Sequence, residues 1–250
     1  MSVPLARGTV LADESAAPAR AWVVPVAFAA ALVLYSNLLY ALPGDLSFPP
    51  DPILFGRALL VPALAVVWAV RTQGLSLTDL GITTRNFWPS AAIGLAAAVA
   101  ITVPAVLFFL FPVGVGDIEY ETFADDSVPE FAFWAAVRYP LSAAVFEEVL
   151  FRGVLLALGL RAFGVRGAVA FTALTFGAWH ICVDYATMSE SSVADDDLLF
   201  AIAQAGAMVA LIVGGAALAW MRLRSGSLAG PIVFHWLAVV AFNSTLFAQT

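Results

Sequence analysis

Two adjacent carboxylates, Glu147 and Glu148, lie in an apolar run of the sequence. An ionisable side chain inside such a run is energetically expensive and is a functional hypothesis by default. Glu148 and Arg152 are four residues apart, so they share a helical face and can form an ion pair. Glu147 is turned about 100° from Glu148 at 3.6 residues per turn, so we expect it to be left as a general base acting on water. The alternative is a structural cluster that locks two helices together.

The chain has only two histidines, His180 and His235, and both lie in later apolar segments. Counted from the polar boundaries at about 1.5 Å per residue, both histidines and Glu148 fall near the middle of a hydrocarbon core. The carboxylates and histidines can therefore converge on one site between helices. Two histidines and a glutamate also suit zinc with an open position, which makes Glu147, His180 and His235 the alternative metal set. The His-Glu-x-x-His spacing of zinc proteases is absent from the sequence.

Two further arginines lie within apolar segments. Arg57 is close to the start of its segment, and we expect its long side chain to reach the polar boundary. Arg138 is deeper in its own segment and suits either an ion pair or contact with a substrate.

The elements that position these residues are expected to be membrane helices. Of the 250 residues, 62% are hydrophobic and 12% are charged, whereas soluble domains have about 25% charged residues. We predict an all-α, polytopic transmembrane bundle of about seven spans, with a mobile tail at 1–20 and one transmembrane domain at 21–250. The apolar segments are 21–42, 53–71, 87–112, 131–158, 165–182, 198–221 and 227–248.

The connections between these segments alternate in charge. Three links hold thirteen acidic residues and no arginine, whereas the tail and the other three links hold eight arginines when Arg71, at the end of the segment before 72–86, is included. The acidic links are 43–52, 113–130 and 183–197, and the arginine-bearing links are 72–86, 159–166 and 222–226. The positive-inside rule then predicts a cytoplasmic N-terminus and a C-terminus outside. We expect a multi-pass integral protein of a prokaryotic plasma membrane.

Composition also excludes several classes of partner. The one cysteine, Cys182, permits no intrachain disulfide and no cysteine metal cluster. The net charge is -7 and no basic patch is present, so nucleic acid is not an expected partner. The expected partners are the lipid bilayer and a membrane-embedded or membrane-proximal peptide.

The polar residues in these segments resemble the motifs of the CPBP family, the CAAX-protease and bacteriocin-processing membrane proteins, also called the Abi family. The resemblance covers about residues 75–245 and is strongest at 140–245. The Glu-Glu-x-x-x-Arg and Phe-x-x-x-His motifs are matched by Glu147, Glu148, Arg152, Phe176 and His180.

The third family motif, His-x-x-x-Asn/Asp, is matched only at His235, because Val239 stands where the family has Asn. Valine has no side-chain donor for an oxyanion. Asn243 is two turns further on and about 80° away around a helix, so it is a poor substitute. Either the backbone or Trp236 compensates, or activity is altered or lost.

The resemblance implies a glutamate-dependent intramembrane endopeptidase that needs no metal. In that scheme Glu147 activates water, and Glu148 supports it and pairs with Arg152. His180 positions the water or donates a hydrogen bond, and His235 helps to stabilise the oxyanion. Zinc is the alternative cofactor.

Two other functions stay open from the sequence. One is a catalytically impaired scaffold or immunity-type protein of the same family, which the missing Asn favours. The other is a transporter or proton pathway, because buried carboxylates and histidines also suit proton relays. No inverted hydropathy repeat is evident, and that counts against a transporter.

Overall fold

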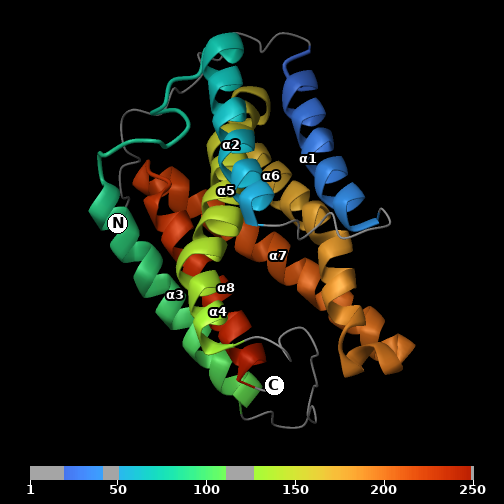
Figure 1. Ribbon diagram of the computed structural model, residues 1–250. Coiled ribbons are helices and arrows are strands. Elements are labelled where there is room, and N and C mark those ends of the chain that lie inside the picture. Colours follow the sequence, from blue (N-terminus) through green and yellow to red (C-terminus); the bar gives the residue numbers. More distant parts are fainter. Residues whose placement is uncertain (1–19, 42–50, 111–126, 249–250) are drawn as a thin grey trace, which may run out of the picture.

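The computed structural model describes residues 20–41, 51–110 and 127–248, and within these ranges it is built of helices with no β-strand. The predicted tail lies outside them except for Arg20, as does most of the acidic links 43–52 and 113–130. Figure 1 shows the helices as one elongated bundle. Its long helices are α1 (Val23–Ala41), α2 (Asp51–Gln73), α3 (Phe87–Leu110), α6 (Leu156–Ser189), α7 (Asp197–Ser225) and α8 (Ala229–Phe247). The shorter elements are α4 (Val128–Phe133), η1 (Trp134–Arg138), η2 (Pro140–Val145), α5 (Phe146–Glu148), η3 (Val149–Leu155) and η4 (Ser192–Asp195).

Six helices of the described part are long and apolar enough to cross a membrane, which confirms the predicted all-α transmembrane bundle. One of the six is the continuous run Val128–Ser189, of 62 residues. A straight helix of that length would extend about 93 Å, roughly three times the thickness of a hydrocarbon core. The run must therefore bend back on itself.

The bend is at Gly164, whose φ of 65° and ψ of -177° interrupt the helix. Positive φ is readily adopted by glycine, which has no Cβ. An added Cβ on Gly159 would lie 3.2 Å from the Cβ of Ala168, so the segments on either side of the bend pack as a hairpin. In Figure 1 the yellow-green run through α5 and the gold run of α6 cross the molecule in opposite directions. The run is thus long enough for two passes, and together with the other five helices the described residues offer seven candidate passes, the number predicted.

The arginine-bearing links meet at one end of the bundle. The Arg222 guanidinium donates to the carbonyl oxygen of Asp79, in the link after α2. The Arg161 guanidinium donates to the carbonyl of Gly74 in the same link. This grouping fits the charge alternation of the sequence, and the side of the membrane on which this end lies stays a prediction.

Helix α6 extends further than predicted. It continues to Ser189, so Asp184 lies on the helix, one turn beyond His180, and not in an acidic link that begins at 183. The predicted segment 165–182 is therefore too short, because the polar residues that follow it do not end the helix. A helix can continue past the apolar stretch when its last turns face a polar boundary.

Helix α8, which carries His235, is held against α3 by close backbone contact. An added Cβ on Gly94 would collide with the backbone of Gly230. The Gly230 N–H donates to the Ser90 hydroxyl at 2.9 Å. Small residues allow membrane helices to approach this closely, and the approach fixes α8 relative to the bundle.

Replacing Gly230 by valine is expected to lower the free energy of unfolding by about 1–3 kcal/mol, because the new side chain has no room. An added Cβ there would lie 2.7 Å from the Ser90 carbonyl oxygen. Thermal unfolding of the purified protein in nanodiscs measures the effect. Gly206→Val is the control, since an added Cβ at Gly206 meets nothing within 4 Å. Equal melting temperatures for both variants would contradict the close α3–α8 contact.

Candidate active site

The carboxylate pair lies on α5, a short α-helical segment between two stretches of π-helix, η2 and η3. Pro140 begins η2 and has no N–H to donate, so a regular α-helical ladder cannot form there. π-Helical turns are rare, and they occur frequently at functional sites. The sequence gives no direct signal for them apart from the proline.

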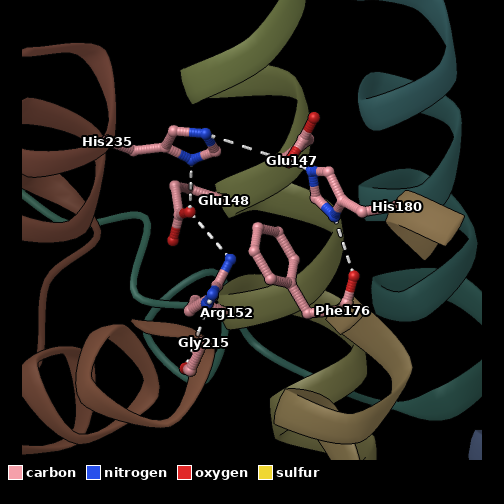
Figure 2. Close-up of polar contacts among 7 residues, drawn as sticks. All are labelled: Glu147, Glu148, Arg152, Phe176, His180, Gly215 and His235. Carbon is pink, nitrogen blue, oxygen red and sulfur yellow. Dashed lines mark hydrogen bonds and ion pairs between the residues drawn. The ribbon is translucent and has the colours of Figure 1, made fainter. Parts of the chain in front are cut away.

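Glu148 is bound from two sides. Arg152 Nη1 donates to Glu148 Oε1 at 2.8 Å, and His235 Nδ1 donates to the same oxygen at 2.8 Å (Figure 2). Glu148 is 0% and Arg152 1% exposed, so the pair is shielded from water. The ion pair expected from the four-residue spacing is present, and the His235 contact joins α8 to it.

The hydrogen bonds at Nδ1 determine that Nε2 is the ring nitrogen of each imidazole left for other partners. A carboxylate oxygen and a carbonyl oxygen only accept, so His235 Nδ1 donates to Glu148 and His180 Nδ1 donates to Phe176 O at 2.8 Å. In the neutral rings Nε2 is therefore the acceptor. Both Nε2 atoms face the same oxygen, Glu147 Oε2, at 3.7 Å from His180 and 3.9 Å from His235 (Figure 2).

Glu147 is buried like Glu148, yet its bonding differs. In the described part of the chain neither Glu147 Oε2 nor Glu148 Oε2 accepts a hydrogen bond, but Glu148 is bound through its Oε1 by Arg152 and His235. Separations of 3.7 and 3.9 Å exceed direct hydrogen-bonding distance and suit a shared water molecule. A carboxylate oxygen and two imidazole nitrogens facing one point are suited to taking a proton from water and passing it on.

Phe176 contributes to the site through both its backbone and its ring. Its carbonyl accepts a hydrogen bond from His180, and the centroid of its ring lies 4.1 Å from the guanidinium carbon Cζ of Arg152. Arg152 Nη2 donates to the Gly215 carbonyl on α7 at 3.4 Å (Figure 2). An added Cβ on Gly215 would lie 3.3 Å from Ala173 Cα, so the glycine allows α7 to lie close to α6 at this point. Sequence reasoning missed Gly215, because a glycine in a membrane helix has many uses.

A cavity of about 130 Å³ reaches Glu147 and His180 from the side of α1 and α2. Sequence reasoning missed the part of its wall that α1 provides. The available signal was a cluster of polar side chains, 35–37, in an otherwise apolar segment. Arg57, expected at the polar boundary, lines this cavity. The polar and charged lining residues are Tyr35, Ser36, Tyr40, Arg57, Ser142, Glu147 and His180.

Both candidate substitutes for the motif Asn donate to backbone carbonyls. Trp236 Nε1 donates to the Ala135 carbonyl at 2.7 Å, and Asn243 Nδ2 donates to the Val239 carbonyl at 2.8 Å. Arg138 is buried and lies 4.4 Å over the Trp134 ring, a packing contact. Its guanidinium is thus oriented by η1.

The residues that would hold zinc are Glu147, His180 and His235, whose Nε2 and Oε2 atoms face one another. As placed, the described side chains include no group of three or more His, Cys, Asp or Glu that could hold a metal ion. The arrangement supports acid–base chemistry directly, and the metal alternative is a matter for experiment.

Comparison with known proteins gives one family match. A family model described as type II CAAX prenyl endopeptidase Rce1-like matches residues 129–241, a segment that contains the carboxylate pair, the arginine and both histidines. The match confirms the resemblance to the CPBP family. No curated protein and no solved structure matches the chain.

Proposed function

Over residues 129–241 this chain is an Rce1-like membrane protein of the CPBP family, and from that premise we propose that it is an intramembrane endopeptidase. It hydrolyses peptide bonds of membrane-associated substrates with water activated by Glu147. The observation that carries the proposal is the asymmetry of the carboxylates. Glu148 is occupied by Arg152 and His235, whereas Glu147 faces the two imidazole Nε2 atoms.

In the proposed mechanism a water molecule lies between Glu147 Oε2 and His180 Nε2. Glu147 takes one proton, and the oxygen attacks the carbonyl carbon of the scissile bond. Collapse of the tetrahedral intermediate breaks the C–N bond, and protonated Glu147 gives its proton to the leaving amine. His180 keeps its orientation because Nδ1 donates to the Phe176 carbonyl.

His235 is proposed to stabilise the oxyanion from its Nε2 when the ring is protonated. The Glu148 carboxylate at 2.8 Å from Nδ1 favours a positive charge on that ring electrostatically. Arg152 compensates the charge of Glu148 when His235 is neutral. The Glu148 carboxylate therefore has a positively charged partner, Arg152, whether His235 is neutral or protonated.

The peptide is proposed to approach through the cavity between α1 and α2, which opens onto Glu147 and His180. Its substrates are membrane-embedded or membrane-proximal peptides, and prenylated tails are one class to test because the matched family is named for them. A prokaryotic plasma membrane, with the arginine-bearing end of the bundle in the cytoplasm, is the proposed location.

Comparison of membrane peptides tests the proposed activity. Wild type, His180→Ala and His235→Ala are expressed at matched levels, and the peptides left in and released from the membranes are identified by mass spectrometry. We expect products of the wild type to be missing from both variants and present in the control, Asn243→Ala, whose amide contacts only its own helix. Identical peptide profiles in all four samples would overturn the proposal.

Val239 favours a second candidate, a relative with impaired catalysis, and Val239→Asn tests whether position 239 limits catalysis. In a working peptidase the substitution adds a donor one turn from His235 and is expected to raise turnover by about 10- to 100-fold. Initial rates of product formation measure this. Val240→Asn, which turns the same amide to another face of α8, is the control and is expected to give no increase. An unchanged rate in Val239→Asn would show that position 239 is not what limits oxyanion stabilisation.

We propose the metal-free mechanism ahead of a zinc mechanism. The proposal rests on the resemblance and on the arrangement of the site, in which the Glu147 carboxylate faces both imidazole Nε2 atoms and can take a proton from water without a metal. Dialysis against a strong chelator, followed by assay and metal analysis, separates the two. Metal-free protein is expected to keep full activity, and loss of activity that zinc alone restores would establish the zinc mechanism.

A further inference from the structure

The side chain of Asn37, on α1, contacts the helical turn of α6 that carries His180. The Cys182 N–H donates to Asn37 Oδ1 at 2.9 Å, and Asn37 Nδ2 donates to the Ala178 carbonyl at 3.0 Å. In a regular α-helix that N–H and that carbonyl are each other's partners, four residues apart. The Asn37 amide therefore binds both ends of the one turn between Ala178 and Cys182.

His180 lies inside this turn, and its ring is oriented by two contacts of different kinds. Nδ1 donates to the Phe176 carbonyl within α6, and Nε2 faces Glu147 Oε2 at 3.7 Å. The first contact fixes the ring relative to α6. The second depends on where this turn of α6 lies relative to α5, and the Asn37 side chain hydrogen-bonds the turn to α1.

The Asn37 amide is fully used, which makes its orientation definite. Besides Ala178, Nδ2 donates to the Val33 carbonyl at 2.8 Å. An unpaired amide in an apolar environment costs several kcal/mol in hydrocarbon reference systems, so all of these bonds favour a single geometry. An amide is also the side chain that offers a donor and an acceptor at one end, as this turn requires. Tyr35 of α1 also stacks on Trp179 of α6, with ring centroids 5.8 Å apart, so an aromatic contact lies beside the Asn37 hydrogen bonds.

Helix α1 lies outside the segment that matches the family, residues 129–241. It nevertheless supplies Tyr35, Ser36 and Tyr40 to the wall of the cavity that reaches Glu147. Figure 1 shows α1 beside α6. Its polar residues are therefore turned toward the site and not toward lipid.

We propose that Asn37 is a positioning residue that sets His180 opposite Glu147, and that α1 is thereby part of the catalytic apparatus. The effect on turnover rests on the proposed peptidase function. The effect on the His180 ring does not, because it concerns the geometry of α1 and α6 alone.

The test variant is Asn37→Leu, which keeps the approximate size and removes all three hydrogen bonds of the side chain, two of them to α6. Because the chain has only two histidines, ¹⁵N-histidine labelling of the full-length protein in nanodiscs gives signals from two rings, which His180→Ala assigns. We expect the ring signals of His180 to change and those of His235 to keep their wild-type values. On a cleaved peptide, turnover is expected to fall about 10- to 100-fold with KM nearly unchanged, since Asn37 does not line the cavity.

Two further variants keep the result interpretable. Asn243→Leu removes another membrane-embedded amide that contacts only the Val239 carbonyl, and it is expected to keep the His180 signals and the turnover of wild type. Asn37→Gln keeps a donor and an acceptor on a longer side chain, so it is expected to restore part of the wild-type His180 signals and part of the turnover. It also replaces Asn37→Leu as the test variant if that variant does not fold.

A lowered melting temperature with wild-type His180 signals and turnover in Asn37→Leu would overturn the proposal, since Asn37 would then be a structural contact only. Changed His180 signals in Asn37→Leu, absent from Asn243→Leu, would support it even if wild type cleaves no peptide. In that case the peptidase function fails and the positioning of His180 stands.

Discussion

Replacing Glu147 by glutamine is expected to lower the turnover of peptide cleavage by about 10³-fold, with the fold unchanged. Glutamine has nearly the shape of glutamate and can still hydrogen-bond to water, but it cannot take the proton that the mechanism requires. Because Glu147 Oε2 accepts no hydrogen bond from the described residues, the substitution leaves no partner stranded. Single-turnover rates and melting temperatures of the purified protein in nanodiscs measure both parts of the expectation.

Asp184→Asn is the control for Glu147→Gln. Asp184 carries another carboxylate in the same region, one turn beyond His180 on α6, and it does not line the cavity. Its replacement is expected to change turnover by only a few fold. An equal loss of turnover in Glu147→Gln and Asp184→Asn would mean that activity depends on the total charge near His180 and not on Glu147 as the base.

Replacing Arg152 by methionine is expected to lower the free energy of unfolding by about 3–5 kcal/mol. The guanidinium donates to Glu148 Oε1 at 2.8 Å and neither residue is more than 1% exposed, so the variant leaves a buried carboxylate with one partner, His235, in place of two. Reversible unfolding in a membrane mimetic measures the loss. The exposed Arg224 lies 5.0 Å over the Trp220 ring, and Arg224→Met is expected to change stability by less than about 1 kcal/mol.

A double variant separates the charge from the contacts. Adding Glu148→Gln to Arg152→Met removes the uncompensated charge and keeps an oxygen that accepts from His235 Nδ1. The double variant is therefore expected to be more stable than Arg152→Met alone. If Arg152→Met unfolds like wild type, then the buried pair does not stabilise the bundle.

Most of the bundle was predictable because apolar length determines membrane helices directly. The predicted spans begin and end within a few residues of α1, α2, α3, α7 and α8. The Glu148–Arg152 pair was predictable for an equally local reason, since residues four apart on a helix are neighbours. The wrong assignment of Asp184 to a link came from the same local reasoning, which ends a span where polar residues begin.

The rest of the site depends on contacts between distant segments, and no periodicity encodes these. His235 and Glu148 are 87 residues apart, and Asn37 and Cys182 are 145 apart. The predicted depths of the carboxylates and histidines in their segments were compatible with one shared site. It did not reveal that His235 binds Glu148 while both Nε2 atoms face Glu147, because that choice depends on the π-helical stretches and the rotation of α8.

The central claim is that Glu147 activates water to hydrolyse a peptide bond in the membrane. The measurement that tests it most directly is cleavage in H₂¹⁸O by wild type and Glu147→Gln, with mass spectrometry of the new carboxyl termini. The account predicts ¹⁸O in the new carboxylate formed by wild type and no such product from Glu147→Gln. Labelled product at the wild-type rate from Glu147→Gln, or no labelled product from wild type, would contradict it.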